Sequence, residues 1–369
     1  MNANRISRRI AALRERAHMN QADLARALGV NDRQTISTIE TGERKVSADE
    51  LVRLADIFAV DLSIFSDPFV VLDEISFSWR RNEVADPVIE QFEGTAKGWL
   101  ALYRHLSRLA GEPINSLVPK LDLTEKSSFE DAASEGESIA AQFELGPVPA
   151  ATLERSLAER LNALVLNVDA PDGISGAACR LGGLNFVLVN RAEPGFRRAF
   201  NIAHELFHLA TWEQMPPAHI ESVRVRSNGN PRPEQLANAF ASGLLMPRQH
   251  LQALIDQHPK PERDERTDWI RTLAEAMGVS AQAMKWRLID LGHLPRAQAS
   301  RMADEDLRLT NDPDARAPLP FSSSFVERLR WGLNEGRLTV RRAAQLMAMT
   351  IDELQTLFEA HGMPVPFDL

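Results

Sequence analysis

The segment His204-Glu205-Leu206-Phe207-His208 constrains this chain most, because it indicates both a helix and a candidate metal site. Residues four positions apart lie on one face of a helix, so the imidazoles of His204 and His208 can bind one zinc ion. Glu205 lies beside them, where it can accept a proton from a zinc-bound water whose pKa the metal lowers to about 7. Composition alone predicts about 0.02 such motifs in a chain of this length.

The alternative interpretation is a surface helix with two incidental histidines. It fits poorly, because apolar residues form a strong helical stripe and the histidines lie along its edge. The stripe consists of Phe200, Ala203, Phe207 and Ala210.

A catalytic zinc ion needs a third protein ligand and an open position for water. Glu234 begins the next predicted helix, 26 residues after His208. Sequence proximity also offers His219, His250, Asp256 and His258. Spacing by itself does not choose among these five residues.

The N-terminal 66 residues predict five short helices, since apolar residues recur there at helical spacing. Charge also differs along the chain: residues 1–66 carry a net charge of +1 and residues 67–369 carry −10. A near-neutral module attached to an acidic body can still bind DNA through a local basic face.

The rest of the chain predicts a mainly α protein with a small β-sheet (α+β). Strands are expected at 164–168 and 184–189, and residues 67–87 are expected to be irregular. Residues 122–159 carry a net charge of −7, which is typical of a solvated linker. Helices are expected at 89–109, 150–162, 196–212, 233–246, 264–294 and 321–360.

A weak internal repeat runs through the chain. Its three copies are residues 23–30, 272–279 and 342–349. Each copy predicts a short helix that ends at a sharp turn, as in helix-turn-helix units. The predicted domains are residues 1–66, a helical connector and acidic linker at 67–139, a core at 140–260 and a helical C-terminal region at 261–369.

Composition sets the broad class of protein. Hydrophobic residues make up 44% and charged residues 25%, which excludes a long disordered or fibrous chain. The single cysteine, Cys179, cannot form an intramolecular disulfide and favours an intracellular protein. Apolar runs are too short for a membrane helix, and the start lacks the apolar core of a signal peptide. We therefore expect a cytoplasmic protein without membrane contact.

Residues 198–208 and 234–247 together resemble the ImmA/IrrE family of bacterial zinc metallopeptidases, with the two motifs in the family's order and at about its spacing. The resemblance implies a zincin-like fold, with zinc bound by His204, His208 and Glu234 and with Glu205 as the catalytic base. Two departures stand out. Phe207 replaces the family's usual glycine, which leaves the ligands intact but is expected to narrow the substrate groove or to change substrate choice. Ser242-Gly243 replaces alanine and a larger residue.

Residues 5–66 resemble the XRE family of helix-turn-helix regulators, through Asn20–Val30, Thr35–Gly42 and Leu51–Phe58. In such a unit the third helix enters the major groove, and its flanks contact phosphates. The turn at 30–35 is one residue longer than usual. The alternative is a protein-interaction module with solvated polar faces. The resemblance implies base contacts from Arg33, Gln34, Thr35 and Thr38 and phosphate contacts from Gln21, Arg44 and Lys45.

The two resemblances imply a stress-responsive transcriptional regulator that binds operator DNA, as a homodimer, and relieves repression by proteolysis. Its protein substrate would be a helix-turn-helix repressor or the chain itself. The alternative is a transcription factor or antitoxin whose peptidase-like domain is a non-catalytic sensor or partner-binding module. Residues 272–294 and 321–358 resemble later parts of the family's chains and are expected to serve in packing or substrate recognition.

Overall fold

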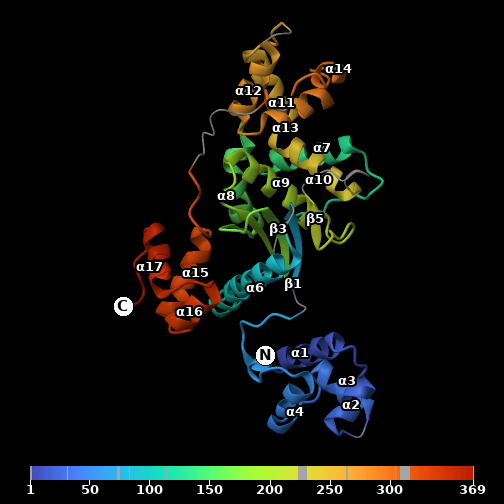
Figure 1. Cartoon of the computed structure of the whole chain (residues 1–369), viewed down its shortest axis with the longest axis vertical. Coiled ribbons are helices and arrows are strands. Elements are labelled where there is room, and N and C mark those ends of the chain that lie inside the picture. The colour runs from blue at the N-terminus through green and yellow to red at the C-terminus, as the bar shows by residue number, and fades with distance from the viewer. Residues whose placement is uncertain are drawn as a thin grey trace.

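The predicted fold class is confirmed by a computed structural model, which is mainly α-helical with one small mixed sheet (Figure 1). Within the described ranges, the helices are too short or too polar to span a membrane. The structure describes residues 2–30, 32–72, 75–82, 84–112, 115, 117–222, 231–262, 265–303, 305–307 and 316–368.

Five helices form the N-terminal unit, as the apolar spacing predicts. Asparagine, aspartate and serine side chains cap the second, third and fourth helices, which fixes where each begins. Their apolar faces enclose a separate core that includes Ile10, Leu24, Ile36 and Leu54. The helices are α1 (Asn2–Arg16), α2 (Gln21–Leu28), α3 (Arg33–Thr41), α4 (Ala48–Phe58) and α5 (Ser63–Ser66).

The sheet has the strand order β2-β4-β3-β1-β5. β2 and β4 are parallel, whereas β3 pairs antiparallel with both β4 and β1. Both predicted strands are present, as β2 and β4. The strands are β1 (Ile75–Arg81), β2 (Ala163–Val168), β3 (Ile174–Leu181), β4 (Leu184–Asn190) and β5 (Ile220–Ser222).

The expectation that residues 67–87 are irregular is wrong, because β1 lies within them. The sequence carries the signal of a strand there: Ile75, Phe77 and Trp79 alternate with polar residues. Phe77 and Trp79 are buried, and β1 pairs with β3 along its whole length.

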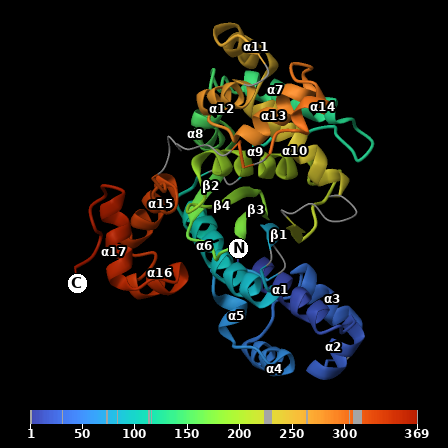
Figure 2. The ribbon, with the colours of Figure 1, turned by 45° about the horizontal axis from the view of Figure 1, so that its top comes forward.

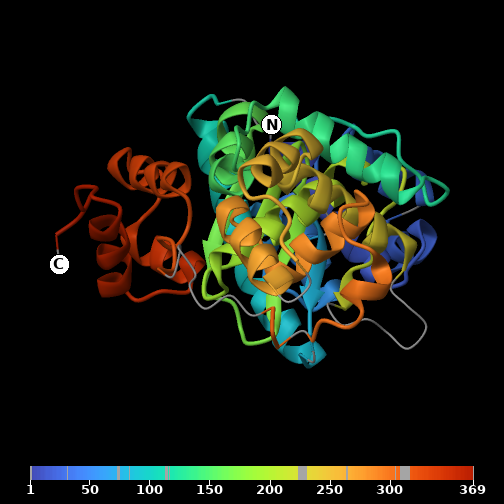
Figure 3. The same ribbon diagram turned by 90° about the horizontal axis from the view of Figure 1, so that it is seen from above.

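Helices cover both faces of the sheet, and two apolar cores result (Figure 2). One face packs against α7 (Phe129–Gln142), α8 (Pro149–Leu161), α9 (Gly195–Thr211) and α10 (Arg232–Leu245). The other face packs against α6 and the C-terminal helices, which stand to one side when the molecule is seen from above (Figure 3). These are α6 (Asp86–Leu109), α15 (Ser323–Asn334), α16 (Val340–Met347) and α17 (Ile351–Ala360).

The acidic stretch is not a solvated linker, which corrects our interpretation of residues 122–139. A capping box at Ser128 begins α7, and the apolar side of this helix joins the core through Ala132 and Ile139. Gly136 of α7 and Gly243 of α10 allow the two helices to approach closely, since a Cβ atom at either position would collide with the backbone of the other helix. The acidic residues belong to the solvated side of a packed helix.

The internal repeat corresponds to three helix pairs with the same corner. The first helix of each pair ends at a left-handed residue: Gly29 (φ 74°), Gly278 (φ 65°) and Ala348 (φ 54°). A polar N-cap then begins the second helix. The remaining helices are α11 (Arg248–Gln257), α12 (Arg266–Met277), α13 (Ala281–Asp290) and α14 (Arg296–Ala299).

Candidate metal centre and DNA-binding surface

The helix α9 carries both histidines of the H-E-x-x-H motif. Its apolar residues, among them Ala203, Leu206 and Ala210, are buried in the core that α9 shares with the sheet and with α10, which fixes the rotation of the helix about its axis. His204 and His208 then lie on one face, one turn apart, with both side chains buried.

The helix α10 brings Glu234 against the two histidines. The Nε2 atoms of His204 and His208 lie 3.0 Å apart. One carboxylate oxygen of Glu234 lies 3.3 Å from Nε2 of His204, and the other lies 3.2 Å from Nε2 of His208. A tetrahedral zinc ion with bonds of about 2.0 Å separates its ligand atoms by about 3.3 Å. The three side chains therefore fit a zinc ion.

Asn238, one turn after Glu234 on α10, orients the first histidine. Its Oδ1 lies 3.0 Å from Nδ1 of His204. An amide oxygen can only accept, so Nδ1 carries the proton and Nε2 keeps its lone pair toward Glu234. Such a second partner fixes the tautomer of metal-binding histidines.

Charge in this site is set by burial and by close neighbours. Burial, reinforced by the positive charge of Arg80, lowers the pKa of His204 to about 3, so the imidazole is neutral and able to bind metal. Burial alone would raise the pKa of Glu234, but the side chains of both histidines, in close contact with its carboxylate, outweigh burial and lower that pKa. A neutral imidazole and an ionised carboxylate are donors suited to zinc.

Glu205 is fully buried beside this cluster. Its carboxylate oxygens have no side-chain hydrogen-bond partner among the described residues, and its contact with the sheet is to the backbone of Ala178 in β3. Burial raises the pKa of Glu205 to about 8. A carboxyl group with this pKa can accept a proton and return it near neutral pH.

The other candidate ligands do not join this cluster; in the part of the chain that is described, the metal-binding group consists of His204, His208 and Glu234. His219 instead contacts the backbone oxygen of Phe77 and the carboxylate of Glu93. His250, Asp256 and His258 lie on or at the end of α11.

Phe207 does not narrow a groove, contrary to our expectation. Its side chain is fully buried between α9 and α10, and its ring lies 5.6 Å from that of Phe240. The bulky residue fills the apolar core behind the histidines.

Sequence reasoning missed Arg80, which reaches the site from β1. Its Nη1 donates to Oδ1 of Asn201, one turn before His204, at 3.0 Å. Its charge also acts on Glu205 and His204. The strand pattern of residues 75–81 is the signal that would have revealed it.

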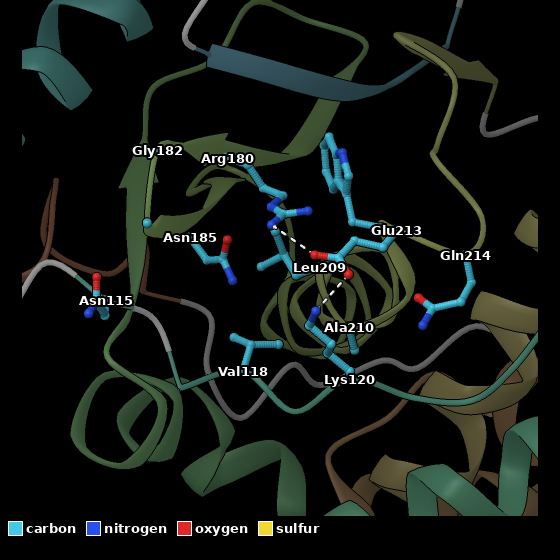
Figure 4. A pocket seen from close by; sticks show the side chains of 12 residues that line it. Asn115, Val118, Lys120, Arg180, Gly182, Asn185, Leu209, Ala210, Glu213 and Gln214 are labelled. Atoms are coloured by element: carbon cyan, nitrogen blue, oxygen red, sulfur yellow. Dashed lines mark hydrogen bonds and ion pairs between the residues drawn. The ribbon is translucent and has the colours of Figure 1, made fainter. Parts of the chain in front are cut away.

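A separate polar pocket of about 270 Å³ lies at the C-terminal end of α9 (Figure 4). Lys120 and Arg180 both point toward Glu213 there, with nitrogen–oxygen distances of 2.6 and 3.9 Å. The metal-binding cluster does not line this pocket.

In the N-terminal unit, the expected base-contacting residues lie on α3. Arg33 and Gln34 are exposed, whereas Thr35 and Thr38 are partly buried. Thr35 also belongs to the helix cap, since its backbone N–H donates to Asp32.

The expected phosphate-contacting residues flank α3. Arg44 and Lys45 are exposed beyond its end, and Arg44 forms an ion pair with Glu50 at 2.7 Å. Gln21 links α2 to α3, accepting from Arg33 and donating to Glu40.

Two family models match the chain. A helix-turn-helix model matches residues 10–65, and a model described as an IrrE N-terminal-like domain, Peptidase_M78, matches residues 158–288. The second range contains His204, Glu205, His208 and Glu234. The chain is a fusion of these two families. Both resemblances seen in the sequence are thereby confirmed, and the fusion combines a DNA-binding regulator fold with a peptidase-family domain.

Two solved structures align with most of the chain at low TM-scores. The crystal structure of Bacillus thuringiensis PlcR in complex with the peptide PapR7 and DNA is 10% identical; the match covers 97% of this fusion and 99% of that chain, with a TM-score of 0.18. The apo form of the competence regulator ComR from Streptococcus vestibularis is 11% identical, with 99% and 100% covered and a TM-score of 0.17. No curated protein matches the chain.

Proposed function

We propose that this fusion is a transcriptional regulator whose IrrE N-terminal-like domain is a zinc-dependent endopeptidase. The observation that carries the proposal is the spacing of the three ligand atoms of His204, His208 and Glu234, which lie within 4.8 Å of one another beside the buried Glu205. The proposed operator and homodimer follow from the helix-turn-helix unit, and the proposed stress signal follows from the resemblance to the peptidase family.

Each residue has a distinct role in peptide hydrolysis. Zinc supplies Lewis acidity and lowers the pKa of its bound water. His204, His208 and Glu234 hold the ion, and Asn238 keeps His204 in the binding tautomer. Glu205 accepts the proton of the attacking water and passes it to the departing amine.

Ligand substitutions test the metal site. We expect wild-type protein to bind one zinc ion per chain, and His204→Ala and Glu234→Ala to lose most of it, because two ligands hold zinc far more weakly than three. The measurement is zinc content by atomic emission after dialysis. His258→Ala, an exposed histidine outside the cluster, is the control and should retain full zinc. Unchanged zinc in His204→Ala would show that the ligands are assigned wrongly.

Substitutions in the N-terminal unit test DNA binding. Arg33→Ala and Gln34→Ala should reduce preference for the operator by roughly 10-fold or more, since base contacts carry specificity. Lys45→Ala should weaken binding about equally on all sequences and flatten its salt dependence, because it removes one phosphate contact. Binding to the chain's own promoter region and to random DNA, measured across salt concentrations, separates these effects. Wild-type protein that binds neither DNA at low salt would favour the protein-interaction module.

The regulatory proposal is that the intact chain represses and that proteolysis ends repression. The substrate is a helix-turn-helix repressor or another copy of this chain. Cleavage within 129–142 is disfavoured, because α7 is a packed helix and its backbone is not an extended segment. Exposed connections elsewhere in the chain are better targets.

Burial of the site favours a second candidate function. His204, Glu205 and His208 are fully buried and Glu234 is 6% exposed. A closed metal site suits a sensor or partner-binding module that does not turn over substrate. Zinc binding without cleavage of casein or of neighbouring gene products would support this function instead.

A further inference from the structure

Arg80 on β1 is partly exposed and contacts α9 one turn before His204. Side chains of β1 alternate between the two faces of the sheet: Phe77 and Trp79 pack toward α6, whereas Arg80 reaches α9. Asn201 and Glu205 on α9 are buried, while Arg80 is partly exposed. A peptide bound beside Glu205 on the Asn201 side of α9 would lie next to the guanidinium group.

The guanidinium group is held in a fixed position. Its Nη1 donates to Oδ1 of Asn201 at 3.0 Å, and its carbon lies 5.9 Å from the ring centre of Phe200. Asn201 is itself fixed, because its Nδ2 donates to Glu193 at 2.6 Å and Glu193 also accepts from Ser175 at 2.8 Å. A donor that is already oriented needs little reorganisation when charge develops beside it.

The Arg80 side chain has more donors than its contacts with the described residues use. A guanidinium group has five N–H donors. Among the described residues, the Arg80 side chain makes one hydrogen bond, to Asn201. Its charge nevertheless acts on both His204 and Glu205, the residues beside which peptide hydrolysis would create negative charge.

We propose that Arg80 is a catalytic residue that donates hydrogen bonds to the carbonyl oxygen of the scissile peptide. This inference rests on the proposed peptidase function. Water adds to the carbonyl carbon and gives a proton to Glu205, and the carbonyl π electrons move to the oxygen facing Arg80. The C–N bond then breaks as the oxygen reforms its double bond, and the departing nitrogen takes the proton from Glu205.

Arg80 lies outside the matched range 158–288. The strand that follows the N-terminal unit therefore completes the site of the IrrE N-terminal-like domain. β1 thereby connects the N-terminal unit to the site on α9. Displacing β1 would remove the guanidinium group from α9.

The test compares neighbouring arginines in the full-length, zinc-loaded protein. Arg80→Ala should lower kcat on casein about 100- to 1,000-fold, as loss of an oxyanion donor does, with KM changed less than about 3-fold. Arg80→Lys should retain part of kcat, and millimolar guanidinium chloride should partly restore Arg80→Ala. Arg81→Ala is the control, since Arg81 instead pairs with Asp86 and Val84; its kcat should stay within about 2-fold.

A binding measurement separates this inference from the proposed function. Inorganic phosphate, a tetrahedral oxyanion, is titrated into the cobalt-substituted protein and followed by the cobalt absorption bands. We expect Arg80→Ala to weaken phosphate binding about 10-fold and Arg81→Ala to leave it unchanged. Phosphate binding that does not depend on Arg80, or a zinc-loaded Arg80→Ala with kcat within 3-fold of wild type, overturns the assignment. If wild-type protein cleaves nothing, the peptidase proposal fails and the catalytic role of Arg80 fails with it. The phosphate titration then shows separately whether Arg80 binds an oxyanion beside the metal.

Discussion

Glu205→Gln is expected to bind zinc as wild-type protein does and to lose proteolysis by about 100- to 10,000-fold, the range for removal of a general base. Glutamine keeps the shape of the side chain but cannot accept the proton of water. The carboxyl group is buried and its pKa is raised to about 8, so a neutral amide should fit the same space without unfolding the site. Zinc content, circular dichroism and cleavage of casein measure the three properties.

Glu213→Gln is the matched control, because Glu213 follows the same helix but lies exposed beside Lys120. It should change none of the three properties. A zinc-loaded Glu205→Gln that cleaves at the wild-type rate would exclude Glu205 as the base. In cells, equal induction of a reporter by wild type and Glu205→Gln under stress would show that regulation proceeds without proteolysis.

The sequence predicts the parts of this fold that depend on local spacing. The i, i+4 histidines require only that residues 204–208 be helical, and the apolar stripe of α9 ensures this. The five N-terminal helices follow equally from local apolar periodicity and caps. Spacing alone left Glu234 as one of five candidates for the third metal ligand. Its contact with the histidines depends on how α10 packs against α9, which local spacing does not predict.

Contacts between distant segments explain what the sequence did not reveal. β1 lies about 100 residues before its partner β3, and its alternating pattern is only seven residues long. Arg80 was therefore not considered, although Asn201, its partner, lies 121 residues away beside the motif. The net charge of residues 122–159 indicated solvent exposure, which holds for one side of α7 but not for its alanine, isoleucine and glycine side.

Gly243→Ala is expected to destabilise the peptidase-family domain by about 3 kcal/mol, near the upper end of the usual range for overpacking. Alanine is a better helix former than glycine, so helix propensity alone predicts that Gly243→Ala stabilises the domain. At this position, however, a Cβ atom would collide with the carbonyl group of Ala133 in α7, with the carbonyl carbon 2.7 Å away. Backbone atoms cannot rotate aside, so α7 and α10 must separate. Because α10 carries Glu234, zinc affinity should fall as well.

Gly94→Ala is the matched control for this change. Gly94 also lies within a helix, α6, but a Cβ atom there meets nothing within 4 Å. It should stabilise the protein by about 0.5 to 1 kcal/mol through helix propensity alone. Urea unfolding of both variants, with and without zinc, measures the difference. If Gly243→Ala unfolds at the same urea concentration as wild type, α7 does not pack against α10 in solution, and residues 122–139 are a linker after all. If Gly243→Ala is destabilised while Gly94→Ala is not, the acidic segment is part of the scaffold that holds Glu234 against the two histidines.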